Sequence, residues 1–318
     1  MEKRRPTLVL TRGLPPAALE RAQSIYDVRM PGQLGWRDWL AGAVQGADAV
    51  VCIPGQRFDA ALIRSLPESI RVIGTFSVGT DHIDLEAARA RPIAVVNTPG
   101  VLSQATAEFT MAMILAAARR MGEAERLVRA GRWHGWTPSD FLGTDISGKR
   151  LGIFGMGRIG QALARIAQGG FGMEVHYRNR RQLPASEERG AVFHAEDAPF
   201  LAASQVLCLL APGGEETALW LNAERLAALP RGAIVVNTAR GTLVDDGALA
   251  AALRSGQVAA AALDVFPREP RVPEVYMDLE NVVLTPHIAT ATVETRDAMG
   301  FAVLDGIGMV LRQKGFRC

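Results

Sequence analysis

Arg240, Glu269 and His287 each follow a short apolar run in the second half of the chain. An arginine fork binds a carboxylate and polarises a carbonyl beside it. A histidine can protonate the alkoxide that forms when such a carbonyl is reduced, and a carboxylate on its second ring nitrogen orients it. We therefore interpret Arg240 as the substrate-binding and polarising residue, His287 as the general acid/base and Glu269 as its orienting partner. The set suits a 2-keto acid.

Each of the three residues alone has a more ordinary interpretation: a surface ion pair, a solvated carboxylate or a histidine bonded to backbone. Their shared context favours the catalytic one, because each closes an apolar run at what would be the carboxyl end of a strand. In open α/β sheets the ligand crevice lies outside those ends. The three segments are Val235–Gly241, Ala262–Pro270 and Leu284–Ala289.

Ten short apolar or β-branched runs alternate with helical patterns along the chain. Several lack polar alternation, which is typical of strands buried on both faces in a parallel sheet. The pattern predicts a doubly wound α/β fold. The predicted strands are Thr7–Leu10, Ala49–Ile53, Arg71–Gly74, Ile93–Asn97, Arg150–Phe154, Glu174–Tyr177, Gln205–Leu210, Ala233–Asn237, Ala259–Leu263 and Asn281–Leu284.

The breaker cluster Asn97-Thr98-Pro99-Gly100 separates two stretches of this pattern. It is followed by one long helical pattern, about 103 to 131, and then by a loop rich in Trp, Gly and Pro up to Gly148. We expect two domains, with the boundary near residue 98. The last stretch, 289 to 314, is again predicted as a helix.

A glycine motif lies between a strand and a helix. Arg150–Phe154 leads into Gly155-Met156-Gly157-Arg158-Ile159-Gly160, and a helical pattern continues to Ala167. This is the G-x-G-x-x-G arrangement in which glycines allow a tight turn, a close approach to pyrophosphate and close helix packing. The free N–H groups of the helix start would face the phosphates. The motif predicts dinucleotide binding, and the alternative is a merely structural glycine turn.

The strand after this motif ends in Arg178-Asn179-Arg180-Arg181 and shows no carboxylate at its tip. An acidic residue at that position would bind a free ribose 2′-hydroxyl, whereas guanidinium groups suit a 2′-phosphate. We therefore predict NADP(H) over NAD(H). The alternative is a solvated basic loop, and equal Michaelis constants for NADH and NADPH would remove the prediction.

Composition excludes several other classes of protein. The 318 residues carry a net charge of +2 and are 48% hydrophobic, so neither disorder nor nucleic-acid or membrane-surface binding is indicated. Cys52 and Cys208 are predicted as buried, reduced thiols, and no Cys/His spacing resembles a metal site. The basic N-terminus lacks the pattern of a secretory signal, and 109–118 is too short to span a bilayer. We expect a cytoplasmic location.

Taken together, the motifs resemble the D-isomer-specific 2-hydroxyacid dehydrogenase family over nearly the whole chain. The resemblance rests on Ser77–Asp84, Asn97–Gly100, Ala105–Glu108, the glycine motif and the three catalytic segments. It implies a flavodoxin-like substrate domain, residues 1–98 and 289–318, into which a Rossmann domain, residues 99–288, is inserted. It also implies a homodimer joined through the nucleotide domains, and closure around the ligand that excludes water.

The resemblance further implies individual contacts. Val78 and Gly79 would offer backbone N–H groups to the substrate carboxylate, with Gly55 nearby, and Asp264 would lie near the nicotinamide amide. Trp136 matches a loop tryptophan that reaches the neighbouring subunit's active site, although a tryptophan buried in the dimer interface is an equal alternative. The expected cofactor contacts are Thr106, Gly155, Met156, Gly157, Arg158, Ile159, Gly160, Arg178, Asn179, Arg180, Ala211, Thr217, Thr238, Ala239, Asp264, His287 and Ala289.

Within the family the chain looks most like NADPH-dependent glyoxylate/hydroxypyruvate reductases, and the 2-ketogluconate reductase group is also similar. It departs from the family at Ala211-Pro212-Gly213-Gly214, where Pro-Leu-Thr is usual. One alternative is NAD-dependent oxidation of phosphoglycerate or D-lactate, for which the single arginine of Pro54–Arg57 gives thin support. Formate oxidation is disfavoured by Glu269, since that branch has glutamine there. A dinucleotide-sensing corepressor would have no need of the catalytic trio.

Overall fold

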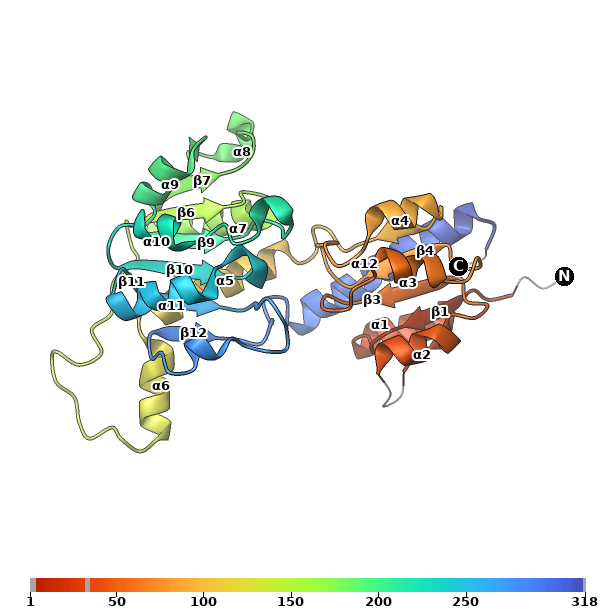
Figure 1. Cartoon of the computed structure of the whole chain (residues 1–318), viewed down its shortest axis with the longest axis horizontal. Coiled ribbons are helices and arrows are strands. Elements are labelled where there is room, and N and C mark those ends of the chain that lie inside the picture. The colour runs from red at the N-terminus through yellow and green to blue at the C-terminus, as the bar shows by residue number, and fades with distance from the viewer. Residues whose placement is uncertain (1–3, 32–34, 317–318) are drawn as a thin grey trace. The chain divides into compact units, whose positions relative to one another are not determined.

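The computed structural model describes residues 4–31 and 35–316. Met1–Lys3 of the basic N-terminus and Cys318 lie outside the described residues. The chain forms two compact units (Figure 1). The first contains the residues up to Leu102 and those from Thr290 onward, and the second contains Ser103–Ala289.

The first unit is built on a five-stranded parallel sheet in the order β2-β1-β3-β4-β5. This is the flavodoxin-like order of a doubly wound sheet. The central strands are buried on both faces, as their unbroken apolar runs predict. The strands are β1 Thr7–Leu10, β2 Asp27–Arg29, β3 Ala49–Cys52, β4 Val72–Thr75 and β5 Ala94–Val96. The helices are α1 Pro16–Ile25, α2 Trp36–Ala43, α3 Ala60–Ser65, α4 Leu85–Ala90 and α12 Val293–Gln313.

The C-terminal helix α12 belongs to this unit and packs against β4. A side chain at Gly74 would come within 2.8 Å of Val303 Cγ2, so the glycine lets the helix approach the strand. The edge strand β2 was not predicted, because its sequence, Asp-Val-Arg, has no apolar run. Polar edge strands are common because they do not invite further pairing.

The second unit contains a seven-stranded parallel sheet in the order β12-β11-β10-β9-β6-β7-β8. The strand order reverses between β6 and β9, as in a Rossmann sheet, and ligands bind such sheets at that switch point. The strands are β6 Arg150–Phe154, β7 Glu174–Arg178, β8 Val192–His194, β9 Val206–Leu209, β10 Ala233–Asn237, β11 Val258–Leu263 and β12 Val282–Leu284. The helices are α5 Ser103–Ala118, α6 Met121–Arg129, α7 Arg158–Phe171, α8 Ala185–Glu188, α9 Asp197–Ala203, α10 Ala223–Ala227 and α11 Asp246–Ser255.

The prediction of one helix over 103–131 was wrong. The helix ends at Ala118, and a second begins at Met121, with Arg120 in the left-handed conformation between them. The returning chain causes the break: Thr144 N–H donates to Ala118 O at 2.9 Å, and Gly143 passes so close that a side chain would strike that carbonyl. Sequence periodicity does not reveal such a tertiary contact.

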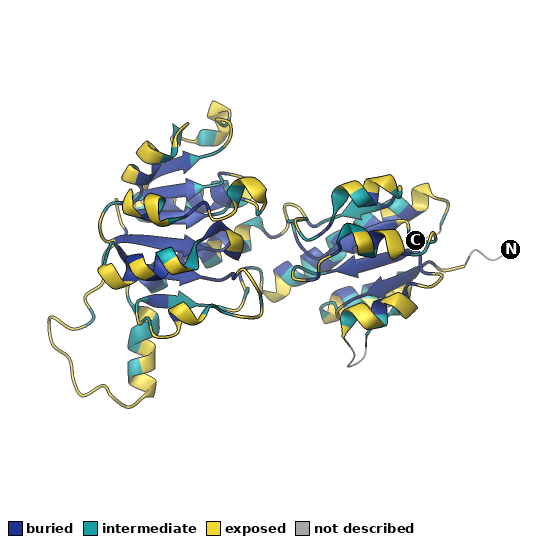
Figure 2. Ribbon diagram, in the orientation of Figure 1, coloured by how far each residue is buried: buried dark blue, intermediate teal, exposed yellow. Residues whose placement is uncertain are grey.

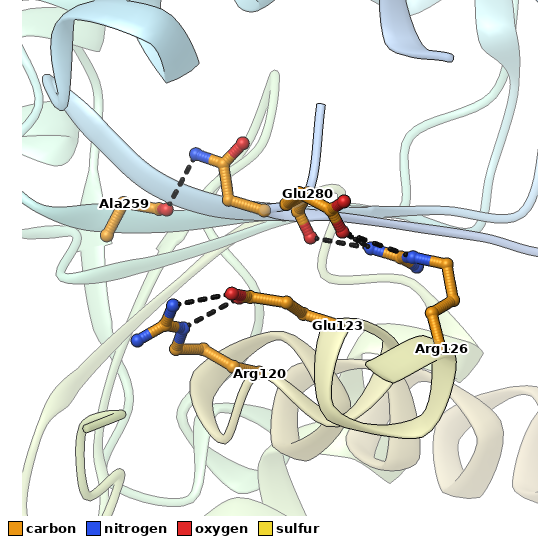
Figure 3. Close-up of polar contacts among 6 residues, drawn as sticks. Arg120, Glu123, Arg126, Ala259 and Glu280 are labelled. Atoms are coloured by element: carbon orange, nitrogen blue, oxygen red, sulfur yellow. Dashed lines mark hydrogen bonds and ion pairs between the residues drawn. The ribbon is translucent and has the colours of Figure 1, made fainter. Parts of the chain in front are cut away.

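Helix α6 has no buried residue, and one ion pair joins it to the segment just before β12. Arg126 pairs with Glu280 at 2.6 Å, and Arg120 pairs with Glu123 at 2.7 Å (Figure 3). The loop after α6 is exposed over 131–140 (Figure 2). Trp133 and Trp136 in this loop are 62% and 76% exposed.

The α/β class with two parallel sheets confirms the predicted fold class. Cys52 and Cys208 are free and buried, as predicted, and burial raises the pKa of the Cys52 thiol to about 12. None of the helices within the described residues is both long and apolar enough to cross a membrane.

Candidate active site

The three predicted catalytic residues follow three neighbouring strands of the second unit. Strands β10, β11 and β12 are parallel neighbours in the sheet, so their carboxyl ends meet at one edge. Arg240 follows β10, Glu269 lies six residues after the end of β11, and His287 lies three residues after the end of β12. The sheet therefore brings together residues that are up to 47 positions apart in sequence.

His287 and Glu269 form a hydrogen-bonded pair. The distance between His287 Nδ1 and Glu269 Oε2 is 2.8 Å, and the side chains are 34% and 27% exposed. Glu269 is held in turn because its Oε1 accepts from Phe266 N–H at 3.0 Å. With Nδ1 committed to the carboxylate, Nε2 is the ring nitrogen that can exchange a proton with a substrate.

The surroundings of Glu269 favour the ionised form of its carboxyl. Its partial burial raises its pKa, but the hydrogen bond and positive charge of His287, the N–H of Phe266 and the charge of Arg240 outweigh burial, so the pKa lies below its usual value. The influence of Arg240 indicates that its guanidinium lies near the pair. The three side chains thus form one electrostatic cluster.

Asp264 anchors the loop that carries His287. Its Oδ1 accepts from Thr285 Oγ1 at 2.7 Å and from Ile288 N–H at 2.9 Å, and its Oδ2 accepts from Ala289 N–H at 2.9 Å. These contacts hold the backbone on both sides of His287, which has a positive φ of 56°. Burial raises the pKa of this carboxyl against the effect of its donors. The sequence prediction gave Asp264 a cofactor contact and missed this anchoring role.

Arg240 sits in a tightly folded turn after β10. Asn237 Nδ2 donates to Arg240 O at 2.9 Å, and Arg240 Nη1 donates to Ala239 O at 2.7 Å. A side chain on Gly241 would overlap the backbone of Phe266 at 2.1 Å, so glycine is required beside the arginine. The residue that departs from the family pattern, Gly213, lies against Arg240: its Cβ would be 3.1 Å from Arg240 Cγ.

The glycine motif has the shape that a dinucleotide requires. Gly155 has a φ of 101°, and a side chain there would strike Ala211 N at 2.4 Å. Gly160 packs against Gly155 O. A side chain at Gly157 would meet nothing within 4 Å, which leaves the open approach that a pyrophosphate needs. Helix α7 begins at the next residue, and its first N–H groups have no partner within the helix.

The arginines after β7 differ in how they are bound. Arg178 Nε donates to Asp197 Oδ1 at 2.9 Å, so a carboxylate from α9 pairs with this arginine at a strand tip that is purely basic in sequence. Asp197 also binds Arg225. Asn179 Oδ1 accepts from Met156 N–H at 2.7 Å and so ties the glycine loop to the tip. Arg180 is 87% exposed, and its contact with exposed Glu216 is long, at 3.4 Å.

The remaining predicted cofactor residues of this unit fall into two groups. Some are buried and bonded internally: Thr238 lies 2.7 Å from Thr110 Oγ1, which donates to Thr106 O. Others lie on loops at the carboxyl edge of the sheet: Thr217 donates to Pro212 O at 2.8 Å. Three alanines also lie at this edge, where only their backbone groups could contact a cofactor. Ala239 is partly buried, and Ala211 and Ala289 are buried.

The predicted substrate residues of the first unit lie at the carboxyl edge of its own sheet. Gly55 follows β3 with a φ of 86° and is exposed, while Val78 and Gly79 follow β4 and are half-buried. Trp136 lies in the exposed loop after α6 of the second unit and is 76% exposed. The predicted contacts of these residues with substrate stay predictions.

Comparison with known proteins gives a consistent result. Residues 111–289 match the model of the D-isomer specific 2-hydroxyacid dehydrogenase NAD binding domain. The chain is 41% identical to a glycerate dehydrogenase of Hyphomicrobium methylovorum, over 94% of each chain. It is 42% identical to a glyoxylate reductase of Aeropyrum pernix, over 96% of this chain and 92% of that protein.

Solved structures agree over the same length. A putative D-isomer specific 2-hydroxyacid dehydrogenase from Polaromonas superposes with a TM-score of 0.90 at 42% identity, covering 98% of both chains. An NADPH-dependent glyoxylate/hydroxypyruvate reductase from Sinorhizobium meliloti, in complex with NADP and malonate, gives a TM-score of 0.85 at 32% identity, covering 95% of this chain and 92% of that one.

Proposed function

Because this chain belongs to the D-isomer-specific 2-hydroxyacid dehydrogenase family, we propose that it uses NADPH to reduce glyoxylate and hydroxypyruvate, with 2-ketogluconate as a further candidate, to D-2-hydroxy acids. It is an oxidoreductase of the glyoxylate/hydroxypyruvate reductase type. The observation that carries the proposal is the His287–Glu269 pair with Arg240 beside it at one edge of a nucleotide-binding sheet.

The chain's own residues divide the chemical work. A bound nicotinamide cofactor supplies the hydride. Arg240 binds the substrate and draws negative charge onto the carbonyl oxygen. His287 donates a proton to that oxygen from Nε2, while Glu269 on Nδ1 holds the ring and stabilises its charged form. In the first unit, the backbone N–H groups of Val78 and Gly79 bind the substrate carboxylate.

The proposal is tested by one kinetic panel: glyoxylate, hydroxypyruvate, 2-ketogluconate and pyruvate, each with NADPH and with NADH. We expect glyoxylate or hydroxypyruvate with NADPH to give the highest kcat/KM. No turnover with any of the four acids would overturn the reaction, whereas equal Michaelis constants for the two cofactors would overturn only the cofactor preference.

We expect Arg180 to be the residue that carries the NADPH preference, because Arg178 is already paired with Asp197. Arg180→Gln removes a charged donor of the kind that binds phosphate, and a charge-assisted hydrogen bond corresponds to about tenfold to hundredfold in affinity. The KM for NADPH should rise by that factor, and the KM for NADH should stay within about twofold. Arg165→Gln, an exposed arginine of α7, is the matched control. A parallel rise in both Michaelis constants would contradict this assignment.

We further propose a cytoplasmic homodimer joined through the second unit. The free, buried thiols of Cys52 and Cys208 support a reducing compartment. The exposed α6 and the loop over 131–140, with Trp133 and Trp136, supply an apolar surface of the kind that interfaces bury.

Trp136 tests the dimer proposal. Sedimentation equilibrium should give twice the chain mass for the wild type. Trp136→Ala should weaken the dimer or, if the indole reaches a neighbouring active site, raise the KM for the larger acids while the dimer persists. Unchanged mass, turnover and KM on every substrate would remove any role for this side chain, and Val192→Ala, at an exposed apolar position on β8, is the control.

A further inference from the structure

The loop after β4 contains three consecutive peptide groups whose carbonyls are bound to donors of the first unit. Ser77 O accepts from Thr98 N–H at 2.9 Å. Val78 O accepts from Asn97 Nδ2 at 2.8 Å, and Gly79 O accepts from Ser77 Oγ at 2.7 Å. The orientation of each of the three peptide planes is therefore set by a separate hydrogen bond.

These bonds also set the direction of three N–H groups. A planar trans peptide points its N–H away from its C=O. The N–H groups of Val78, Gly79 and Thr80 are thus turned away from Thr98, Asn97 and Ser77. Within the described part of the chain, none of these N–H groups donates to a protein acceptor. The three residues are half-buried, so a ligand could reach them. Successive backbone N–H groups that point to the same side can together bind an anion.

A chain of buried hydroxyls fixes the proton on Ser77. A carbonyl only accepts, so the single hydroxyl proton of Ser77 goes to Gly79 O. Thr75 Oγ1, 2.8 Å from Ser77 Oγ, must then be the donor of that contact. His82 Nε2, 2.9 Å from Thr75 Oγ1, must in turn donate to the threonine. The bonds run in one direction, from His82 through Thr75 and Ser77 to Gly79, and bonds in such a chain strengthen one another.

We propose that Ser77 and Asn97 are positioning residues for substrate binding: they hold the peptide groups between Ser77 and Thr80 so that three N–H groups face the carboxylate of the 2-keto acid. Thr75 and His82 act behind Ser77 by fixing its proton. This inference rests on the proposed function for the identity of the substrate. It adds Thr80 N–H to the carboxylate site. It also gives a positioning role to four side chains that do not touch the substrate: Ser77, Asn97, Thr75 and His82.

Two substitutions test the inference from different directions. Ser77→Ala removes the donor to Gly79 O, and Asn97→Asp replaces the donor to Val78 O with an oxygen that repels it. The control is Ser69→Ala, which removes a buried hydroxyl of the same unit for which the described residues offer no hydrogen-bond partner. Each variant is assayed as the full chain for turnover, for NADPH affinity, and for binding of oxamate, a 2-keto acid analogue that is not reduced, to the enzyme saturated with cofactor.

We expect the Kd for oxamate and the KM for glyoxylate to rise together by about tenfold to hundredfold in both variants, which is the range for weakening a hydrogen bond to a charged group. The kcat should change less than about threefold, and NADPH affinity should not change. Thr75→Ser, which keeps the hydroxyl, should behave as the wild type, whereas Thr75→Val should resemble Ser77→Ala. A loss of kcat at constant KM, or oxamate affinities within twofold of the wild type in both variants, would overturn the inference.

The oxamate measurement keeps this inference distinct from the proposed function. A wild type that binds oxamate but reduces none of the four acids would overturn the reaction and leave the positioning role standing, provided that both variants weaken oxamate. If the wild type turns over glyoxylate while Ser77→Ala and Asn97→Asp leave its KM unchanged, the proposed reaction stands and the positioning role is overturned.

Discussion

Replacing His287 with asparagine should lower kcat by about a thousandfold, within the range that general acid catalysis contributes. Asparagine tolerates the positive φ of this position but cannot deliver a proton at neutral pH. The loop should keep its shape because Asp264 holds it through Thr285, Ile288 and Ala289 rather than through the imidazole. Steady-state turnover of glyoxylate with NADPH measures the effect, and fluorescence titration should show cofactor affinity within about threefold of the wild type. Turnover that persists near the wild-type level would mean that another group donates the proton.

The partner substitution Glu269→Gln separates orientation from chemistry. Glutamine keeps the size of the side chain but loses its charge, so we expect a smaller fall in kcat than for His287→Asn. Because the folded-state pKa of Glu269 lies below 4.5, its ionised form contributes stability that is present above that pH and lost as the pH falls through the lowered value. The difference in Tm between wild type and Glu269→Gln should therefore be present at pH 7 and shrink as the pH falls below 4.5. A difference in Tm that does not depend on pH would contradict the charged pair.

Replacing Arg240 with lysine should lower kcat/KM by about a hundredfold although the charge is kept. Loss of one donor to a developing oxyanion costs about this much, and an ammonium group cannot reproduce the planar fork that matches a carboxylate and its neighbouring carbonyl. Arg240→Met, which also removes the charge, should be worse by a further factor of about ten. The KM should rise and kcat should fall, because the same guanidinium binds the substrate and polarises it.

The control for this series is Arg268→Lys, at an exposed arginine beside Glu269. It makes the same chemical change close to the site without altering a proposed substrate contact. Similar losses in Arg268→Lys and Arg240→Lys would show that the loss does not come from a specific contact of the Arg240 guanidinium with the substrate.

Much of the fold could be predicted because its core strands are unbroken apolar runs. Runs such as Ala233–Asn237 are buried at every position, and such runs stand out in sequence without any need for alternation. The convergence of Arg240, Glu269 and His287 at one edge of the sheet could also be predicted, because the ends of parallel strands converge whatever the details of packing. The family and the oxidoreductase class agree with the comparisons.

The features that sequence reasoning missed depend on contacts between distant segments. The break at Arg120 is caused by a chain that returns more than twenty residues later. The pairing of Arg178 with Asp197 brings a carboxylate from α9 to a strand tip that looked purely basic. The anchoring of the His287 loop by Asp264 likewise joins residues more than twenty positions apart. None of these pairs shares a local pattern that a single sequence displays.

The backbone conformation at position 287 narrows the choice of residue independently of any reaction. At a φ of 56°, β-branched side chains are excluded by steric overlap, and glycine, asparagine, aspartate and histidine are the residues that such a backbone best admits. Of these four, only histidine is an imidazole, so chemistry and stereochemistry select the same residue for unrelated reasons. Substitutions that this backbone accepts at position 287 would therefore give proteins that fold and are inactive, rather than proteins that misfold.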